Sequence, residues 1–282
     1  MGRTENINVF QDTMNLCKNN DRIRESVHNS AEGQKLILEG DAVAEPDKNR
    51  YKEKARITVS KKRTFEAALG YRGTKTAVHN FASASNPGGG VERGANAQEE
   101  CLCRCSGLFK CLNAPDAWSG FYMAHRAEHN PIHNDDIIYT PDVLVFKSDT
   151  VKPELMEEAD WYNVDVITCA APNLREKLSN AFNTGDGKDA IKITDKDLLA
   201  IHEKRLRRIL DVALSNKVET IVLGAFGCGA FMNNPNVVAQ ASKNVVNEYL
   251  YAFKNIEFAV YCSPKDDTNY RIFDRVLKPY TK

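Results

Sequence analysis

Short apolar runs of strand length alternate with longer helical patterns along most of this chain. The strand candidates are rich in β-branched or aromatic residues, and they cover residues 55–60, 75–82, 137–146, 165–170, 219–226 and 257–262. Apolar side chains recur at helical spacing between them, most clearly over residues 195–215 and 235–253. Such alternation is typical of an α/β sandwich with helices covering a central sheet, and we expect that fold class here.

The N-terminal part of the chain lacks this alternation. Residues 1–50 contain a helical pattern in which four apolar side chains share one face: Ile7, Phe10, Met14 and Cys17. No internal repeat, low-complexity tract or long Pro/Gly/Ser linker interrupts the sequence. We therefore expect a single domain over residues 1–282, in which residues 1–50 form a helical extension packed on the core.

Charge and hydropathy exclude several partner classes. The chain has 38 Lys plus Arg and 38 Asp plus Glu, so its formal net charge is zero. Proteins that coat nucleic acid or anionic membranes favour a strong basic excess. No run approaches the roughly 18 apolar residues of a membrane span, and the first residues lack the apolar core of a signal peptide. We expect a cytoplasmic protein with no membrane partner and no sequence-specific nucleic-acid partner.

Four of the eight cysteines are clustered in one segment, at Cys101, Cys103, Cys105 and Cys111. The Cys-x-Cys-x-Cys spacing differs from the knuckle of a structural zinc site, and no His pair follows at zinc-finger spacing. A helix over residues 97–112 would place Cys101 and Cys105 on one apolar face. Small free thiols commonly fill protein cores, so we expect buried thiols and no metal.

The histidines suggest a second metal site at first sight. His125, His129 and His133 recur every fourth residue, but Pro131 breaks a helix before the third. This predicts a surface segment rich in histidine. Two further histidines lie on apolar segments and are expected in the core: His79 and His202.

Two glycine-rich loops each follow a strand candidate and precede a helix. The first is Asn86-Pro-Gly-Gly-Gly-Val91, and the second spans residues 224–231 (GAFGCGAF). Glycine lets backbone N–H groups converge on an anion, and a helix N-terminus adds its positive dipole end. Two such loops favour a diphosphate between adjacent strand ends, although either alone could be a tight turn. Neither matches the P-loop or the Gly-x-Gly-x-x-Gly fingerprint.

Gln98-Glu99-Glu100 follows the first glycine loop, at the start of the predicted helix. Acidic residues in a first turn can simply complement the helix dipole. A carboxyl beside a phosphate loop can also perform acid/base chemistry on an attached sugar. Adjacent helical residues diverge by roughly 100° and cannot flank one bond as the carboxyl pair of an ordinary glycosidase does. Glu99 and Glu100 would therefore have different roles, one in the chemistry and one in holding sugar hydroxyls.

The segment NFASASNPGGGVERGANAQEECLCRCSGL resembles the signature of microbial-type poly(ADP-ribose) glycohydrolases, a macrodomain family. The resemblance continues in the family's order through DVITCAAPN (165–173), VLGAFGCGAFMNNP (222–235) and FAVYCSP (258–264). It covers nearly the whole chain. It implies a macrodomain-like three-layer α/β/α sandwich with a mixed central sheet and an N-terminal helical extension.

The resemblance also implies a set of ADP-ribose contacts. The first diphosphate loop and its neighbours would be Asn86, Gly88, Gly89, Gly90 and Val91, with Asn86 and Val91 beside the distal ribose. The second loop would be Gly227, Cys228, Gly229 and Ala230, and Phe231 would pack against the ribose or base. Gln98 would support the loop, and Glu99 would hold ribose hydroxyls.

In the implied reaction, Glu100 donates a proton to the ribose–ribose glycosidic oxygen, and an oxocarbenium-like ribose forms. The ionised Glu100 then deprotonates the attacking water. The substrate would be poly(ADP-ribose) or ADP-ribosylated protein, degraded mainly from chain ends, and the product ADP-ribose. The resemblance implies no metal and no cofactor, and we expect a monomer.

Three other functions remain open at this point. One is hydrolysis of mono-ADP-ribose by the same fold, and another is ADP-ribose binding without cleavage. Binding a diphosphate gains nothing from two nearby carboxylates, which argues against a pure binding module. The third is thiol- or metal-based redox chemistry, which would require exposed thiols of low pKa in the 101–111 segment.

Overall fold

Seven strands form one mixed sheet in the computed structural model, which describes residues 1–43, 46–178 and 185–281. The strand order is β1-β4-β5-β3-β6-β7-β2. The strands are β1 (Lys35–Ile37), β2 (Arg56–Ser60), β3 (Thr76–Ala82), β4 (Ile137–Val145), β5 (Tyr162–Ala170), β6 (Thr220–Leu223) and β7 (Asn255–Ala259). The sheet confirms the expected α/β class and the mixed character implied by the family resemblance.

The five strands from β5 to β2 are parallel to one another, whereas β4 is antiparallel to both β5 and β1. The pairing of Ala82 with Ala170 and of Ser60 with Ala259 marks the ends of neighbouring parallel strands. The carboxyl ends of β5, β3, β6, β7 and β2 therefore lie along one edge of the sheet. Loops that follow these strands converge there, as expected for ligand sites in open α/β sheets.

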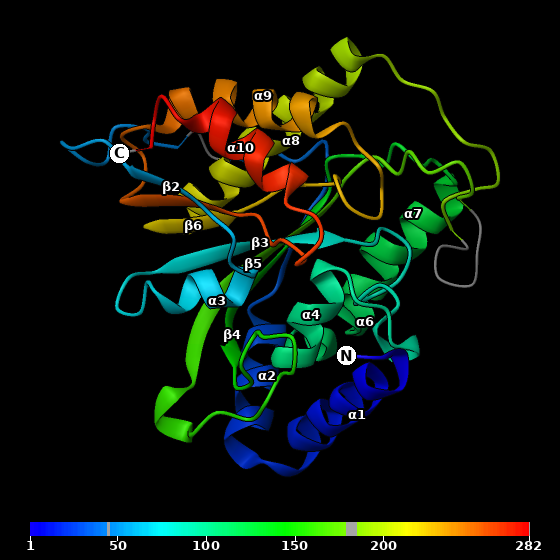
Figure 1. Ribbon diagram of the computed structural model, residues 1–282. Coiled ribbons are helices and arrows are strands. Elements are labelled where there is room, and N and C mark those ends of the chain that lie inside the picture. Colours follow the sequence, from blue (N-terminus) through cyan, green and yellow to red (C-terminus); the bar gives the residue numbers. More distant parts are fainter. Residues whose placement is uncertain (44–45, 179–184, 282) are drawn as a thin grey trace.

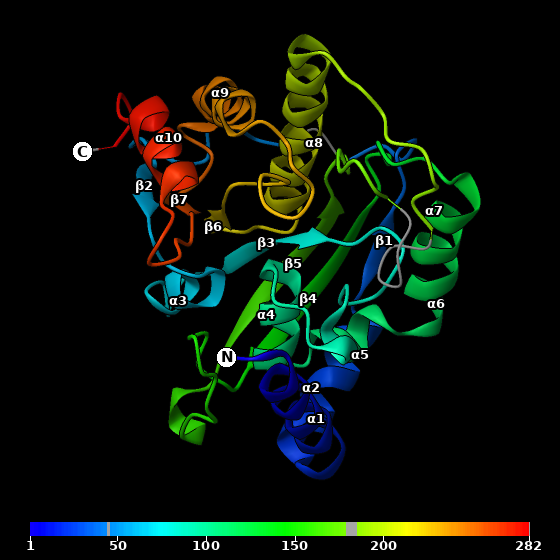
Figure 2. The same ribbon diagram turned by 45° about the vertical axis from the view of Figure 1, so that its right-hand side comes forward.

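Helices cover both faces of the sheet, which gives the three layers (Figures 1 and 2). One face carries α8 (Asp195–Ser215), α9 (Pro235–Val246) and α10 (Thr268–Leu277). The opposite face carries α1 (Arg3–Asn19), α2 (Asp21–Glu32), α3 (Thr64–Leu69), α4 (Gln98–Cys105) and α5 (Leu108–Leu112). At one side lie the short helices α6 (Pro115–Ala117) and α7 (Met123–Glu128).

The N-terminal helices are packed on the core. Phe10 contacts Phe109 of α5 edge to face, with ring centroids 4.9 Å apart. The buried Lys147 ammonium, just after β4, donates to the Val9 carbonyl and the Thr13 hydroxyl. It also pairs with Asp12 at 2.7 Å. These contacts tie α1 to the sheet layer.

Some element boundaries differ from the sequence-based expectations. The predicted helix over 97–112 is wrong as one element, because Ser106 is extended (φ −150°, ψ 177°) and bridges Val145 of β4. The helical prediction for residues 1–50 fails beyond Glu32, where a three-residue edge strand follows. Strand β6 ends at Leu223, three residues before the predicted limit.

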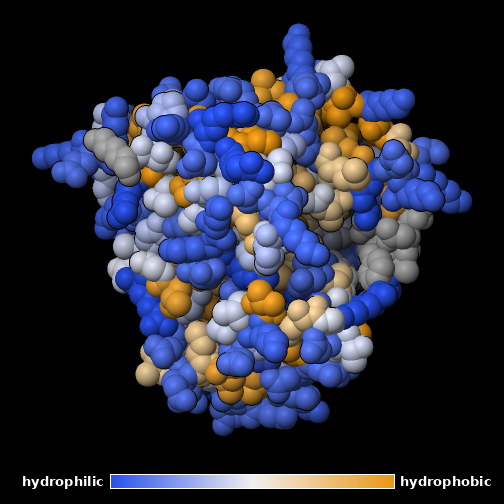
Figure 3. Space-filling view, in the orientation of Figure 1, coloured by the Kyte–Doolittle hydropathy of each residue, from blue (hydrophilic) through white to orange (hydrophobic). Residues whose placement is uncertain are grey.

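No helix in the described ranges is long and apolar enough to cross a membrane. Hydrophobic residues on the face shown in Figure 3 form separate patches within a largely hydrophilic surface. This surface agrees with the balanced charge and negative mean hydropathy (−0.46) of the sequence.

Candidate active site

A cavity of about 870 Å³ opens at the carboxyl ends of the parallel strands. Its walls come mainly from the segments that follow β2, β3, β4, β5, β6 and β7 and from the start of α4, and Met1 also lines it. Among the residues expected to bind ADP-ribose or to act in catalysis, nine line it: Gly89, Gly90, Gln98, Glu99, Glu100, Gly227, Gly229, Ala230 and Phe231. The structure thus brings both glycine loops and the acidic pair to one cavity.

The first glycine loop folds its backbone around the Glu100 carboxyl. Gly88 and Gly89 both have positive φ, at 63° and 60°, a conformation that costs other residues about 1–2 kcal/mol. A Cβ on Gly89 would lie 2.6 Å from Glu100 Oε1 and 3.2 Å from Glu99 Oε2. The close approach of backbone and carboxyls therefore requires glycine at position 89.

Two backbone amides fix the orientation of Glu100. The Gly90 N–H donates to Oε1 and the Ala97 N–H donates to Oε2, both at 2.9 Å. The second bond belongs to a capping arrangement at the start of α4. Glu100 is only 7% exposed but lines the cavity, so its carboxyl is held rigidly at the wall.

Glu99 lies deeper and accepts hydrogen bonds from β3 and the turn after it. The Ser83 N–H donates to Oε2 at 2.8 Å, and Asn80 Nδ2 donates to Oε1 at 3.2 Å. Burial raises the pKa of Glu99 from its ordinary value to about 8, although the Ser83 N–H opposes this shift. The raised pKa favours the protonated form of Glu99 at neutral pH.

Gln98 joins the start of α4 to the neighbouring strand. Its Oε1 accepts from the Phe81 N–H at 2.9 Å. Its Nε2 donates to the His79 carbonyl at 2.8 Å and to the Thr64 hydroxyl at 3.0 Å. The three bonds hold the helix that carries the acidic pair against β3.

The second glycine loop is held from behind by an asparagine that the sequence reasoning missed. Asn233 is 2% exposed, and its Nδ2 donates to the carbonyls of Pro172, Gly227 and Phe231 at 2.6–3.2 Å. Its Oδ1 lies 2.8 Å from the ring Nε2 of His202. A Cβ on Gly227 (φ 76°) would lie 2.7 Å from the Ala171 Cβ, so this turn also requires glycine.

Four residues of the expected set do not line the cavity: Asn86, Gly88, Val91 and Cys228. Val91 is 1% exposed and packs in the core beneath α4. The side chain of Cys228 packs against the core under α8 and α9, and burial raises the pKa of its thiol. The Asn86 amide oxygen accepts from Arg126 at 2.6 Å.

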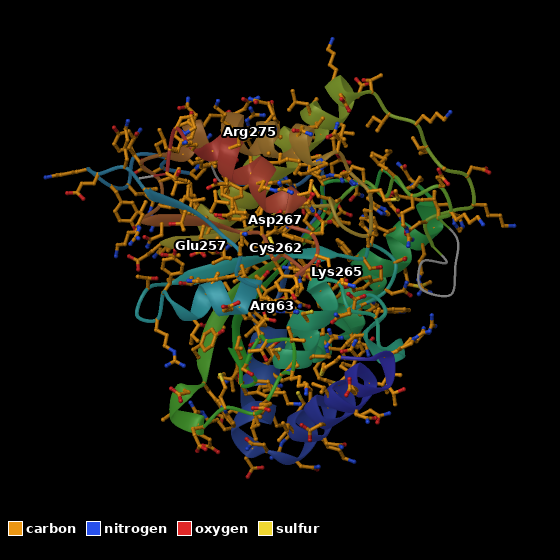
Figure 4. All side chains as sticks on the ribbon, in the orientation of Figure 1. Arg63, Glu257, Cys262, Lys265, Asp267 and Arg275 are labelled. Atoms are coloured by element: carbon orange, nitrogen blue, oxygen red, sulfur yellow. The ribbon has the colours of Figure 1, made fainter. Side chains whose placement is uncertain are left out.

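The cavity has a further group of side chains at the β7–β2 side. The Arg63 guanidinium lies 4.1 Å from the Tyr261 ring centroid and 3.8 Å from Asp149 Oδ1. Burial raises the pKa of Asp149 to about 6, against the lowering effect of Arg63. Figure 4 places Arg63 beside the segment that carries Cys262 and Lys265.

No motif in the sequence predicts this group. Arg63 follows the strand candidate 55–60 and Tyr261 lies near the end of the candidate 257–262, so the only available signal was their position at strand ends. The order of the strands in the sheet, which decides that these two ends are neighbours, cannot be read from the chain.

The clustered thiols are buried, as expected from the sequence. Burial raises the pKa of Cys101, Cys103, Cys105 and Cys111 above its ordinary value. They therefore lack the low pKa that the redox alternative requires. Among the residues that the structure describes, no group of three or more His, Cys, Asp or Glu side chains could hold a metal ion.

The prediction of a surface histidine segment is wrong for His125 and His133, which are 4% and 5% exposed. The chain turns back after Pro131, whose carbonyl accepts from the Asn173 N–H at 2.7 Å. This turn packs the segment under the cavity wall, with the His133 ring centroid 6.3 Å from that of Phe231. Local helix breaking could not reveal this tertiary contact. His79 and His202 are buried as predicted.

Asp165 and Asn173 flank the strand candidate 165–170, and the sequence allows them either to contact ligand or only to cap and turn the chain. Asp165 does not line the cavity: its carboxylate accepts from the Tyr139 hydroxyl at 2.5 Å and from the Asp142 N–H at 3.0 Å. Asn173 is fully buried, and its Oδ1 accepts from Arg175, which does line the cavity. Asn173 thus positions a cavity arginine and does not itself reach the cavity.

The charge of residues 183–197 predicts a surface loop whose last residues enter a helix. Helix α8 does begin at Asp195, and residues 183 and 184 lie outside the described part of the chain. Asp186 departs from this expectation, since it is 3% exposed. Its carboxylate accepts from Asn173 Nδ2 at 2.8 Å. This bond draws one end of the loop against the cavity wall.

Comparisons with known proteins agree with this geometry. Residues 4–148 match the family model "Microbial-type PARG, catalytic domain". The structure resembles a poly(ADP-ribose) glycohydrolase from Thermomonospora curvata solved with the inhibitor ADP-HPD, at 28% identity and a TM-score of 0.77 over 96% of this chain and 98% of the other. It also resembles the enzyme from Deinococcus radiodurans in complex with ADP-ribose, at 30% identity and a TM-score of 0.72 over 90% and 97%. A search of curated protein sequences found no match.

Proposed function

Because this chain belongs to the family of microbial-type PARG catalytic domains, we propose that it releases ADP-ribose from poly(ADP-ribose), mainly from chain ends, with Glu100 as general acid and base. The observation that carries the proposal is the Glu100 carboxyl, held by two backbone N–H groups at the wall of a cavity between two glycine loops. This is the arrangement that acid/base work on a sugar next to a bound diphosphate needs.

The order of the strands supports one direction for the bound ADP-ribose in this proposal. The acidic pair follows β3, the second glycine loop follows β6, and Tyr261 follows β7. A diphosphate between the glycine loops puts the distal ribose beside Glu99 and Glu100. The adenosine then extends across β7 toward Tyr261 and Arg63, where an aromatic ring and a guanidinium offer stacking surfaces for the base.

The reaction begins with Glu100 protonated. Its proton passes to the ribose–ribose glycosidic oxygen, the bond from that oxygen to the anomeric carbon breaks, and the departing ribose keeps its hydroxyl. The positive charge on the remaining ribose is stabilised by the neighbouring diphosphate. Glu100, now ionised, takes a proton from the water that attacks the anomeric carbon. The carboxyl returns to its starting state, so no co-reactant besides water is consumed.

Glu99 holds the distal ribose in this proposal. Its protonated carboxyl adds no negative charge next to the diphosphate and can donate one hydrogen bond to a ribose hydroxyl. The Ser83 N–H and Asn80 fix its position. The adjacent acids therefore divide the work: Glu99 positions the sugar, and Glu100 transfers protons.

The preference for chain ends is proposed from the side chains at the β7–β2 side of the cavity. Arg63 and Tyr261 contact each other there, and both line the cavity beside the expected adenosine position. A polymer that continued past the adenosine would have to displace these side chains. Terminal units need no such displacement.

The test is incubation of the purified protein with automodified poly(ADP-ribosyl)ated protein, followed by separation of the products. Free ADP-ribose as the main product is expected throughout the time course. Accumulation of oligomers would contradict the preference for chain ends. Release of ADP-ribose only from mono-modified substrates would indicate a mono-ADP-ribosyl hydrolase, and tight ADP-ribose binding without any release would indicate a binding module.

ADP-ribose affinity is expected to fall above pH 8. Binding an anion beside Glu99 favours its neutral form, and Glu99, with a pKa of about 8, loses its proton as the pH rises through that value. One linked proton lowers the affinity by up to about tenfold per pH unit above the pKa. Calorimetric titrations from pH 6.5 to 9.5 measure the effect.

The Glu99→Gln variant supplies the comparison for this titration, because its amide cannot ionise and its pH profile is expected to be flat. Glu92→Gln, at an exposed position between the first glycine loop and α4, is the matched control and should keep the native pH profile. A native affinity that stays constant to pH 9.5 would show that Glu99 does not titrate beside the ligand.

A further inference from the structure

The loop between the Gly-Gly-Gly and Gln-Glu-Glu motifs is held by hydrogen bonds from the first turns of α1. This loop, residues 91–97, connects Gly90 to the start of α4. The Arg3 guanidinium donates to the Arg93 carbonyl at 2.7 Å, and Asn6 Nδ2 donates to the Gly94 carbonyl at 3.1 Å. Both views of the fold place the N-terminus and α1 beside α4 (Figures 1 and 2).

The contact between helix and loop is tight at Gly94. This residue has φ 76°, and a Cβ there would lie 2.3 Å from the Arg3 carbonyl oxygen and 2.8 Å from the Arg3 Cγ. A backbone oxygen at that distance cannot be moved without moving the helix. Asn6, whose amide makes the buried bond, is 2% exposed. The surfaces of α1 and the loop are therefore fitted to each other at backbone level.

A second set of bonds holds the same loop from the side of α4. The buried Arg104 donates to the Ala95 carbonyl at 2.7 Å and to the Asn96 side chain at 2.5 Å. Its own carbonyl accepts from the Thr13 hydroxyl of α1 at 2.6 Å. Thus α1, α4 and the loop form one connected network.

The two ends of this loop are the atoms that orient the catalytic carboxyl. Gly90, just before it, and Ala97, its last residue, donate the two N–H groups that hold Glu100. Any shift of residues 91–97 therefore changes the direction of the Glu100 carboxyl. Misplacement of a catalytic group by about 1 Å can cost on the order of 100-fold in rate.

We propose that the first turns of α1 are a positioning element for Glu100, with Asn6 and Gly94 as its central contact. The inference rests on the proposed function, since it concerns the same carboxyl. Asn6 is not among the residues that line the cavity, and it acts through its hydrogen bond to the loop. Loss of the Asn6 side-chain amide is therefore expected to slow turnover and to leave the affinity for ADP-ribose nearly unchanged.

The test compares Asn6→Ala with Asn15→Ala, the same substitution at an exposed position of the same helix. In Asn6→Ala, kcat is expected to fall about tenfold when it is calculated per ADP-ribose binding site, as counted by calorimetry. The KM and the Kd of ADP-ribose should stay within about twofold of the native values. Asn15→Ala should match the native protein. Counting binding sites removes any contribution from unfolded molecules.

Hydrogen exchange supplies a readout that does not depend on turnover. Amides of the 88–98 peptide are expected to exchange about tenfold faster in Asn6→Ala and at the native rate in Asn15→Ala. Gly94→Ala should reproduce both effects, because it pushes Arg3 away from the loop. The double variant should then be no slower than the worse single variant.

Two outcomes would contradict the proposal that the first turns of α1 position Glu100. One is a native kcat per binding site in Asn6→Ala, which would make the contact merely structural. The other is native exchange over residues 88–98 in both variants. Absence of ADP-ribose release by the unmodified protein would instead contradict the proposed function, and the exchange measurements would still decide whether α1 holds the loop.

Discussion

Glu100→Gln is expected to lower kcat for ADP-ribose release by about 1,000-fold, while the Kd of ADP-ribose changes by less than about threefold. General acid–base catalysis by a positioned side chain contributes roughly 100- to 10,000-fold, and this carboxyl performs both proton transfers in the proposed reaction. Glutamine has the same shape but cannot supply a proton. Product analysis under saturating poly(ADP-ribose), with calorimetry for binding, measures the two quantities.

The substitution also changes the hydrogen bonds of the loop. Glutamine can accept from only one of the Gly90 and Ala97 N–H groups, because its NH₂ would face the other. Thermal unfolding must therefore accompany the assay, and Glu92→Gln on the exposed part of the loop is the control for charge. Full activity of folded Glu100→Gln would assign the acid to another residue.

The sequence predicted the architecture well because six of the seven strands and most helices carry their own local signal. The runs around β2, β3, β4 and β5 and the stripe of α8 were located from local pattern alone. The edge strand β1 was missed because three residues, Lys35–Ile37, carry no period. The break at Ser106 was missed because pairing with Val145 of β4 determines it, and no local propensity shows that pairing.

The cavity was predictable only where a motif runs along the chain. Gly89, Gly90 and the acidic pair are close in sequence, and their spacing already indicates shared chemistry. Arg63 and Tyr261 come from distant segments and meet because β7 and β2 are neighbours in the sheet, whereas Asp149 reaches Arg63 from the segment after β4. The strand order is a property of the whole fold, so residue patterns could not bring these side chains together.

The side-chain directions of individual residues in the glycine loops also could not be predicted from the sequence. Val91 and Cys228 lie in the glycine loops, yet their side chains pack in the core and do not line the cavity. Alternation of side-chain direction within an irregular loop has no fixed period, unlike that in a strand. The pKa of Glu99 likewise follows from its burial, which sequence spacing does not give.

Gly89→Val is expected to weaken ADP-ribose binding by about 100-fold and to reduce turnover further. A β-branched residue is a strong outlier at a φ of 60°, so the loop must change its backbone conformation. The N–H groups that would face the diphosphate then diverge. Gly40→Val is the matched control, since a Cβ at exposed Gly40 meets nothing within 4 Å, and it should bind as the native protein does. Calorimetry gives both affinities.

Gly89→Ala separates the two consequences of substitution at this position. The atoms nearest to its Cβ belong to the two carboxyls, with Glu100 Oε1 at 2.6 Å, and alanine lacks the two γ-methyl groups of valine. Turnover should therefore fall more than affinity in the alanine variant, whereas the valine variant should lose both. Unchanged affinity in folded Gly89→Val would mean that the diphosphate lies away from this loop. Equal losses of turnover and affinity in Gly89→Ala would mean that the loop and the carboxyls move as one unit. In that case, the position of Glu100 could not be disturbed without also disturbing the phosphate site.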